Sequence, residues 1–415
     1  MKKIFFMAVS AVLLAAGCQK TEIQNEVLPK IGFKTHLGKL TKADADEVKS
    51  GDVKLKEQGF RAWGYFVNEN DLNYEKGDLY LHDETEGNED LGVKVEWSTA
   101  WNTIGTHYWP GKGKALDIYS VSLAEEDGNS YTNVYPNWED FTVTVEDFVV
   151  GAKADNDLMV APIIRQDQSR ETVEPKFQHA LTKVLLKFKR TNESTEVYLV
   201  SAKTSPIPSK GRLVVTNTDP SATVVVDDTT PDGETTPDGE GAGEDEDEDE
   251  DETTTTEDTD LFKWTLLNDE NGKLATTEYE AEGFSRDDTV EDVVISENVN
   301  KDVAAYQLSE TYTTCGSWLL IPQEDIKPVA AKEATDTTPA IEATEGYYLD
   351  VEYIVEKTYI KQRFNLYTST LDKWARNQQT TYNITISPDE IRFTPEVEDW
   401  VVEEKRPAVN EDRFN

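Results

Sequence analysis

The residue types that most often carry chemistry are few in this sequence and stand too far apart to act together. Its four histidines are His36, His82, His107 and His179. None lies within five residues of another, which excludes the closely spaced histidine pair of a zincin-type metal site. The chain also lacks the Gly-x-Ser-x-Gly turn that presents a nucleophilic serine. We therefore expect no enzymatic activity, no cofactor and no bound metal.

Two other kinds of chemistry are weakly indicated. Residues 105–112 resemble a phosphate-binding loop, but one residue too many separates the two glycines, and Gly113 follows Lys112 where the motif needs a hydroxyl. Paired carboxylates for glycoside hydrolysis stay open, because their pairing is spatial. With 82 acidic residues, the sequence offers no way to choose such a pair.

Cys18 is the residue best placed for covalent chemistry. Lys2 and Lys3 precede an apolar run at residues 4–16, which is too short to span a bilayer and is typical of a signal peptide. The run ends in Ala-Ala-Gly-Cys, which resembles a bacterial lipobox, although Leu14 stands one position too early. We expect residues 1–17 to be removed, Cys18 to carry palmitate and other acyl chains, and residues 18–29 to form a tether. The alternative is an ordinary signal peptide with a chance cysteine.

Composition narrows the possible partners. Cys18 and Cys315 are the only cysteines in the sequence, so lipidation of Cys18 leaves Cys315 without a partner for a disulfide. The formal net charge is −41 at pH 7, and such a surface repels nucleic acid and anionic lipid heads. We therefore expect no nucleic-acid partner.

The charge is densest in one segment. Residues 227–260 hold 18 acidic residues and no Lys or Arg. Like charges at that density repel and extend a chain, so we expect a disordered insertion between two strand-like segments. Weak, unspecific cation binding is the most that its carboxylates indicate.

The rest of the chain has the period-two alternation of half-buried strands. Examples are Ile31-Phe33-Thr35, Phe141-Val143-Val145 and Tyr382-Ile384-Ile386. Turn residues separate many such runs, which indicates an all-β protein of sandwich type. A polar segment before Phe177 suggests an N-terminal domain at residues 30–176 and a C-terminal domain at 177–415.

Several of these segments, taken in order, resemble the fimbrillin family, the FimA-type and Mfa-like lipoprotein subunits of type V pili. The most telling is Phe-Gln-His-Ala-Leu-Thr-Lys-Val at residues 177–184. The others are residues 31–33, 40–43, 63–66, 108–110, 116–120, 157–161, 319–323, 382–386, 391–393 and 397–400. The resemblance covers essentially the whole mature chain.

The resemblance implies two tandem transthyretin-like β-sandwich domains and a surface subunit of fimbriae that serves adhesion. It implies export to the outer membrane, removal of the first strand by a trypsin-like protease, and acceptance of a donor strand from another subunit. Here the removable strand is residues 30–37, and Lys39 and Lys42 are the nearest sites for processing. We expect the donor strand in the closing segment of the sequence, at Tyr382, Ile384, Ile386, Ile391 and Phe393. A chain that is not processed would be an anchor or a tip subunit.

The alternative is a surface glycan-binding lipoprotein of a polysaccharide-utilisation system. Four tryptophans offer a sugar-stacking platform: Trp63, Trp101, Trp109 and Trp138. Tryptophan in a β-rich chain more often belongs to the core, and we expect these to do so. His179 we expect to form hydrogen bonds at the domain junction and not to catalyse.

Overall fold

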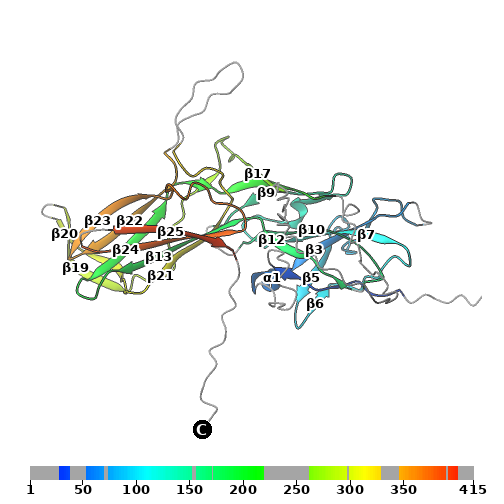
Figure 1. Cartoon of the computed structure of the whole chain (residues 1–415), viewed down its shortest axis with the longest axis horizontal. Helices are drawn as coiled ribbons and strands as arrows, with labels where there is room; N and C mark the ends of the chain where they lie inside the picture. Colours follow the sequence, from blue (N-terminus) through cyan, green and yellow to red (C-terminus); the bar gives the residue numbers. More distant parts are fainter. Residues whose placement is uncertain are drawn as a thin grey trace, which may run out of the picture.

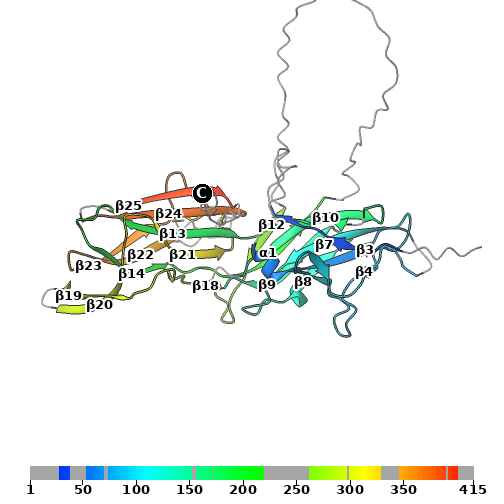
Figure 2. The ribbon, with the colours of Figure 1, turned by 90° about the horizontal axis from the view of Figure 1, so that it is seen from below.

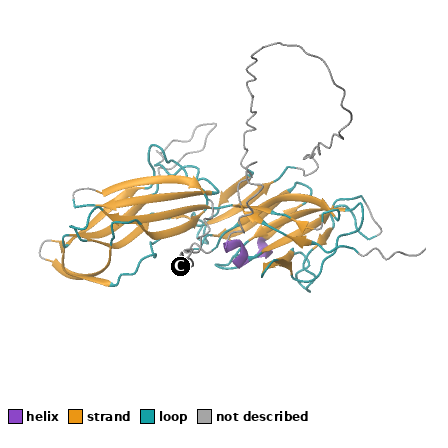
Figure 3. Ribbon diagram, turned by 60° about the horizontal axis from the view of Figure 1, so that its bottom comes forward, coloured by secondary structure: helices purple, strands orange, loops and turns teal. Residues whose placement is uncertain are grey.

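The protein is built almost entirely from β-strands. The computed structural model describes residues 28–37, 53–69, 73–151, 156–170, 172–218, 261–296, 299–328, 345–388 and 391–400. This part contains 25 strands, one short helix, α1 (Val53–Gln58), and one 3-10 turn, η1 (Tyr131–Asn133). The strands gather in two lobes that lie end to end along the long axis (Figures 1 and 3). The expected all-β class is confirmed.

The first lobe holds the largest sheet. Its strands, in order across the sheet, are β2 (His36–Leu37), β12 (Lys176–His179), β10 (Met159–Asp167), β7 (Ala115–Ser122), β3 (Phe60–Phe66), β5 (Val93–Trp97) and β6 (Trp101–Thr103), with β4 (Leu79–Leu81) also paired to β3. A two-stranded pair, β1 (Gly32–Phe33) and β11 (Thr172–Val173), lies beside it. The earliest strand of the large sheet, β2, therefore pairs with its latest, β12, at one edge.

A second sheet packs against the first. Its strands, in order, are β17 (Phe262–Leu266), β16 (Lys210–Thr216), β9 (Thr142–Val149) and β8 (Val134–Asn137). The boundary predicted before Phe177 does not follow this hydrogen bonding. β12 spans that position and pairs with β10, while β16 pairs with β9 from the other side of it. The division into residues 30–176 and 177–415 stays a prediction, and the pairing of β16 with β9 crosses it.

The second lobe combines two further sheets. One has the order β21 (Thr313–Leu320), β13 (Thr182–Arg190), β24 (Gln378–Ile386) and β25 (Ile391–Asp399), and Figure 2 shows β25 along its outer edge. The other sheet is closed into a ring of hydrogen-bonded strands, in the order β14 (Val197–Thr204), β20 (Val299–Gln307), β19 (Asp288–Ser296), β23 (Thr358–Asn365) and β22 (Tyr348–Val355). A short pair, β15 (Ile207–Pro208) and β18 (Thr276–Thr277), completes the strands.

Two large hydrophobic clusters stabilise this arrangement, and a third, small one of Val293, Ala305 and Ile354 lies in the second lobe. The larger fills the space between the two sheets of the first lobe and continues into the second lobe, with Trp63, Val143 and Tyr382 among its buried members. The smaller lies on the opposite face of the large sheet and includes Phe33 and Phe60. The large sheet is therefore covered on both faces, and its second face is the one that the N-terminal segment reaches.

The alternating pattern correctly predicts the buried apolar side chains of residues 31–33 and of β24, but it places Asn383 in water, and Asn383 is only 7% exposed. Ile31 and Phe33 are 4% and 6% exposed, while Lys34 between Phe33 and Thr35 is exposed. Tyr382, Ile384 and Ile386 are completely buried in β24. Phe141 departs from its pattern: it lies in the turn before β9 with a φ of 53° and is only partly buried.

Candidate functional site

The N-terminal segment at residues 28–37 is inserted between two other parts of the first lobe. On one side, the Ile31 amide donates to the His107 carbonyl (2.9 Å) and the Trp109 amide donates to the Pro29 carbonyl (3.0 Å). On the other side, the Lys34 amide donates to the Val173 carbonyl (2.9 Å), and β1 and β2 run parallel to β11 and β12. This segment occupies a groove whose walls both supply backbone hydrogen bonds.

Side chains fill the floor of this groove. The Phe33 ring meets the Phe60 ring edge-on, with centroids 5.5 Å apart. Phe60 in turn contacts Phe177 of β12 and Trp101 of β6, with centroids 5.1 and 5.3 Å away. Because alternate residues of a strand point to the same side, Ile31 and Phe33 enter the core together while Lys34 faces solvent. The first strand therefore contributes both a ladder of hydrogen bonds and part of a core.

The residues that follow this strand, 38–52, are not among the described ones. Lys39 and Lys42, the predicted processing sites, lie there. Cys18 and the acidic segment 227–260 are likewise outside the described residues. The described residues resume at α1. Arg61 is the first arginine in the sequence. Its side chain is buried in β3, where Nη1 lies 3.1 Å from Asp83 Oδ2 and donates to the Gly92 carbonyl (2.8 Å). A trypsin-like protease therefore has no access to Arg61 in the folded chain.

The residues predicted for a donor strand fall in two different environments. Tyr382, Ile384 and Ile386 lie in β24, which pairs with β13 on one side and β25 on the other. Ile391 and Phe393 lie in β25, which is paired only with β24 among the described strands. Of these two strands only β25 lies at an edge of the described sheet, so β25 can leave without dismantling its centre and β24 cannot.

The predicted donor edge also carries features that limit indiscriminate pairing. Pro395 stands in the middle of β25 opposite Tyr382, and charged side chains at Arg392, Glu396 and Glu398 are exposed. Proline removes a ladder donor, and charges on an edge strand disfavour contact with other chains. On its inner side β25 is held by the Phe393 ring, which stacks on Tyr382 with centroids 5.1 Å apart.

His179 lies where the two lobes meet, and the prediction that it forms hydrogen bonds there is confirmed. Its Nδ1 is 2.7 Å from Asp157 Oδ2, and both side chains are 2% exposed. Its ring stacks on Trp400, with centroids 3.6 Å apart and planes inclined by 9°. Arg376 binds the same strand, donating from Nη1 to Gln178 Oε1 (3.2 Å) and to the His179 carbonyl (3.3 Å). Sequence reasoning missed Trp400 and Arg376 as the partners.

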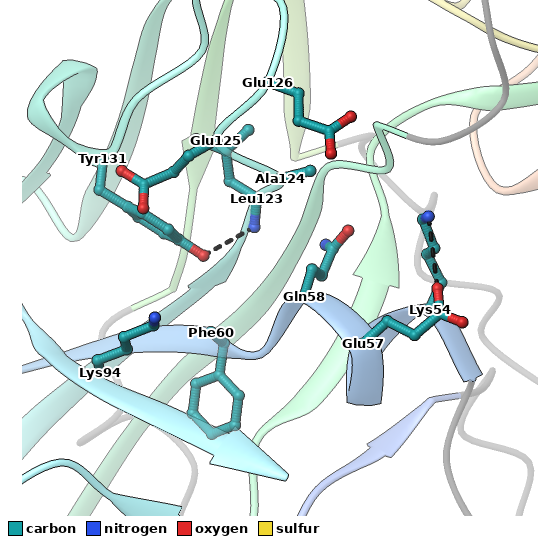
Figure 4. A pocket seen from close by; sticks show the side chains of 10 residues that line it. All are labelled: Lys54, Glu57, Gln58, Phe60, Lys94, Leu123, Ala124, Glu125, Glu126 and Tyr131. Carbon is teal, nitrogen blue, oxygen red and sulfur yellow. Dashed lines mark hydrogen bonds and ion pairs between the residues drawn. The ribbon is translucent and has the colours of Figure 1, made fainter.

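A cavity of about 320 Å³ opens beside α1 (Figure 4). Lysines and glutamates share its rim, and Lys54 Nζ lies 3.5 Å from Glu57 Oε2. Tyr131 in its wall accepts a hydrogen bond from the Leu123 amide (2.9 Å), and burial raises the pKa of its hydroxyl. Tyr131 is therefore part of the packed wall of the cavity.

The described residues contain no metal-binding group of three or more His, Cys, Asp or Glu side chains. The four tryptophans considered for sugar stacking do not form an exposed platform. Trp63 and Trp109 are fully buried and Trp101 is 9% exposed, as expected for core residues. Trp138 is only partly buried, and it packs over Gly77, where an added Cβ would lie 2.2 Å from its ring. None of the described helices is long and apolar enough to cross a membrane.

Comparison with known proteins bears on the chain as a whole. Three solved Bacteroides structures are similar to the chain: a fimbrial protein from B. vulgatus (15% identity, TM-score 0.49, covering 90% of this chain and 100% of that one), and candidate cell adhesion proteins from B. ovatus (14%, 0.43, 91% and 99%) and B. uniformis (13%, 0.41, 90% and 99%). These likenesses are too weak to carry an argument. The sequence matches no curated protein. The model of the fimbrillin-like family, however, matches residues 77–400, which is most of the chain, and the chain therefore belongs to the fimbrillin-like family.

Proposed function

We propose that the chain is a subunit of cell-surface fimbriae that assembles by exchange of its first strand. Membership of the fimbrillin-like family supports a fimbrial subunit whose role is structural and adhesive. The observation that carries the mechanism is the first strand itself, which is hydrogen-bonded on both sides and buries Ile31 and Phe33. A strand held in this way is a plug that a similar strand from another subunit can replace.

The energetics favour replacement over simple loss. Taking Ile31 and Phe33 out of the core exposes two large apolar side chains, at a cost of roughly 1.5–3 kcal/mol each. The walls at residues 107–109 and 172–177 would also lose backbone partners. An incoming strand with alternating apolar residues restores both terms. The emptied groove is therefore a high-energy state that drives assembly.

The route to this state begins outside the described residues. The chain is exported on its signal peptide, lipidated at Cys18 and held at the outer membrane. A protease then cuts after Lys39 or Lys42, which releases the first strand together with the lipid anchor. The burial of Arg61 supports these lysines as the sites, because the first arginine lies within β3. Other pilin subunits are the partners that this route requires.

The donor that the geometry supports is β25, with Ile391 and Phe393 as the side chains that fill the acceptor. The edge position of β25 allows it to leave the sheet without breaking the pairing of β24 with β13. Tyr382, Ile384 and Ile386 remain in their own sheet, because β24 is paired on both sides. No observation on the described residues favours the glycan-binding alternative.

The assignment to fimbriae is tested by negative-stain microscopy of cells that produce the chain, with gold-labelled antibody against it. We expect gold on thin surface fibres. Labelling along the fibre marks a stalk subunit, and labelling at one end marks a tip or an anchor. Gold spread over the cell surface with no association with fibres would contradict the proposal. Cells that lack the gene are the control for antibody specificity.

A further inference from the structure

The contact between His179 and Trp400 joins the end of the predicted donor strand to the strand that borders the groove. Trp400 follows directly on β25, and its amide donates to the Asn377 carbonyl (3.1 Å). Its indole stacks flat on the His179 ring, and the Lys183 ammonium lies 5.7 Å from the centre of the indole. Figure 1 shows the end of β25 reaching the middle of the molecule, close to β12.

The His179 side of this contact is held rigidly. Nδ1 donates to the Asp157 carboxylate, and burial of both groups leaves the imidazole few other orientations. The backbone of Asp157 accepts from Gln58 Nε2 (2.8 Å), so α1 supports the same corner. The Trp400 side, in contrast, is the end of an edge strand. The stack therefore attaches the end of the edge strand β25 to the firmly held His179 imidazole.

β12 connects this contact to the first strand. Its outer edge pairs with β2, Lys176 opposite His36 and Phe177 opposite Leu37. Phe177 and His179 are two residues apart, so their side chains share one face of β12. Phe177 reaches the Phe60 ring on which Phe33 also packs, while His179 reaches Trp400. One strand thus touches the plug of the groove and the end of the donor.

We propose that the His179–Trp400 stack is an autoinhibitory latch that keeps β25 in its own sheet while the first strand occupies the groove. This inference rests on the proposed function and adds its regulation. Release of the first strand leaves β12 without its outer partner and Phe177 without part of its packing. β12 then holds His179 less rigidly, the stack on Trp400 weakens, and β25 is freed to leave. A subunit becomes a donor only once it has become an acceptor, which prevents assembly before processing.

The latch is tested by hydrogen exchange with mass spectrometry on the purified full chain. Trp400→Ala should speed exchange in residues 391–399 about tenfold, because the edge strand loses its terminal anchor. Phe33→Ala should also speed exchange there, although Phe33 lies in the other lobe. In the double variant the two effects should not multiply, because a latch that is already open cannot be opened again. Because coupling between two sites acts in both directions, Trp400→Ala should also speed exchange in residues 30–37.

Tyr312→Ala is the matched control. Tyr312 is an aromatic contact at the far end of the same sheet, where its hydroxyl lies 2.9 Å from Thr385 Oγ1. In that background Phe33→Ala should still speed exchange in β25 by its full factor. Should Trp400→Ala unfold the second lobe, Trp400→Phe keeps a smaller ring on His179 and permits the same comparison.

Two results would overturn the latch. One is Phe33→Ala speeding exchange in β11 and β12 while β25 keeps its wild-type rate. The other is full multiplication of the two factors in the double variant. Both are measured on monomers, so they stand apart from fibre formation. Loss of the coupling leaves the fimbrial proposal intact, and absence of fibres leaves the measured coupling intact.

Discussion

Phe33 of the first strand packs edge-on against Phe60 of β3, with ring centroids 5.5 Å apart and planes inclined by 76°. The two rings come from segments that the chain joins through residues 38–52, in which both predicted processing sites lie. A cut in that joining segment would separate the partners covalently and leave the contact itself in place. The core of the first lobe thus depends on a strand that a single cleavage would make exchangeable.

Phe33→Ala should lower the free energy of unfolding by about 3 kcal/mol, because it leaves a cavity against Phe60. Lys34→Ala in the same strand should change it by no more than about 0.5 kcal/mol, since that side chain is exposed. Denaturant titration of both variants gives the comparison. Equal costs for the two substitutions would show that the first strand does not contribute to the core.

Asp83→Asn should destabilise the first lobe in a pH-dependent way. Burial by itself raises the pKa of Asp83, but hydrogen bonds from Thr85 and the Arg61 guanidinium outweigh it and hold that pKa below its usual range. A lowered carboxyl pKa contributes stability at neutral pH that is lost as the pH falls through the folded-state pKa. The variant should therefore be less stable than the wild type by about 2 kcal/mol at pH 7.

On acidification this difference should shrink, because the wild-type carboxyl becomes protonated and loses its advantage. Thermal unfolding at pH 7, 5 and 3 measures it. Glu139→Gln is the control, because that side chain is exposed and should show no comparable effect at any pH. A gap between wild type and Asp83→Asn that is constant from pH 7 to pH 3 would argue against the Arg61 pairing.

Cys315 should be unreactive in the folded protein. Its side chain is completely buried in β21, and burial raises the pKa of the thiol to about 12. The thiolate is the reactive form, so alkylation at pH 8 should be limited by unfolding. Labelling of a Cys18→Ser variant with iodoacetamide, with and without denaturant, measures this. Rapid labelling of Cys315 without denaturant would mean that β21 is open to solvent.

Cys18→Ser should abolish incorporation of labelled palmitate in cells that make the full chain. The reason is chemical, since serine lacks the thiol to which the lipid is attached. Cys315→Ser, which removes the other cysteine, is the control and should retain the label. Persistence of palmitate on the Cys18→Ser protein would refute lipidation at this position.

Local patterns predicted what depends on local geometry. Period-two alternation correctly indicated that Ile31, Phe33 and the apolar residues of β24 are buried. It was wrong for the other face of β24, where Asn383 is only 7% exposed. The domain boundary near Phe177 stays a prediction, and strands on opposite sides of it pair with each other. Strand pairing is non-local, and nothing in residues 210–216 indicates that they lie beside β9.

The junction shows the same limit more clearly. His179 was expected to form hydrogen bonds, because a buried imidazole needs partners. Asp157, Arg376 and Trp400 were not identifiable as those partners, since they come from three distant segments. The sequence likewise groups the five predicted donor residues in one closing segment. Only the sheet order separates β24, which is paired on both sides, from the edge strand β25.

Limited digestion of the purified full chain with trypsin tests the exchangeable first strand most directly. The account predicts one early cut after Lys39 or Lys42, followed by a ladder of oligomers that resists SDS. Arg61 should stay uncut, because β3 buries it. The variant with Lys39, Lys42 and Lys49 all changed to Gln has no basic residue between β2 and α1, and should remain monomeric under the same dose. A first cut inside the described sheets, or the predicted cut with no oligomers at any protein concentration, would contradict the account.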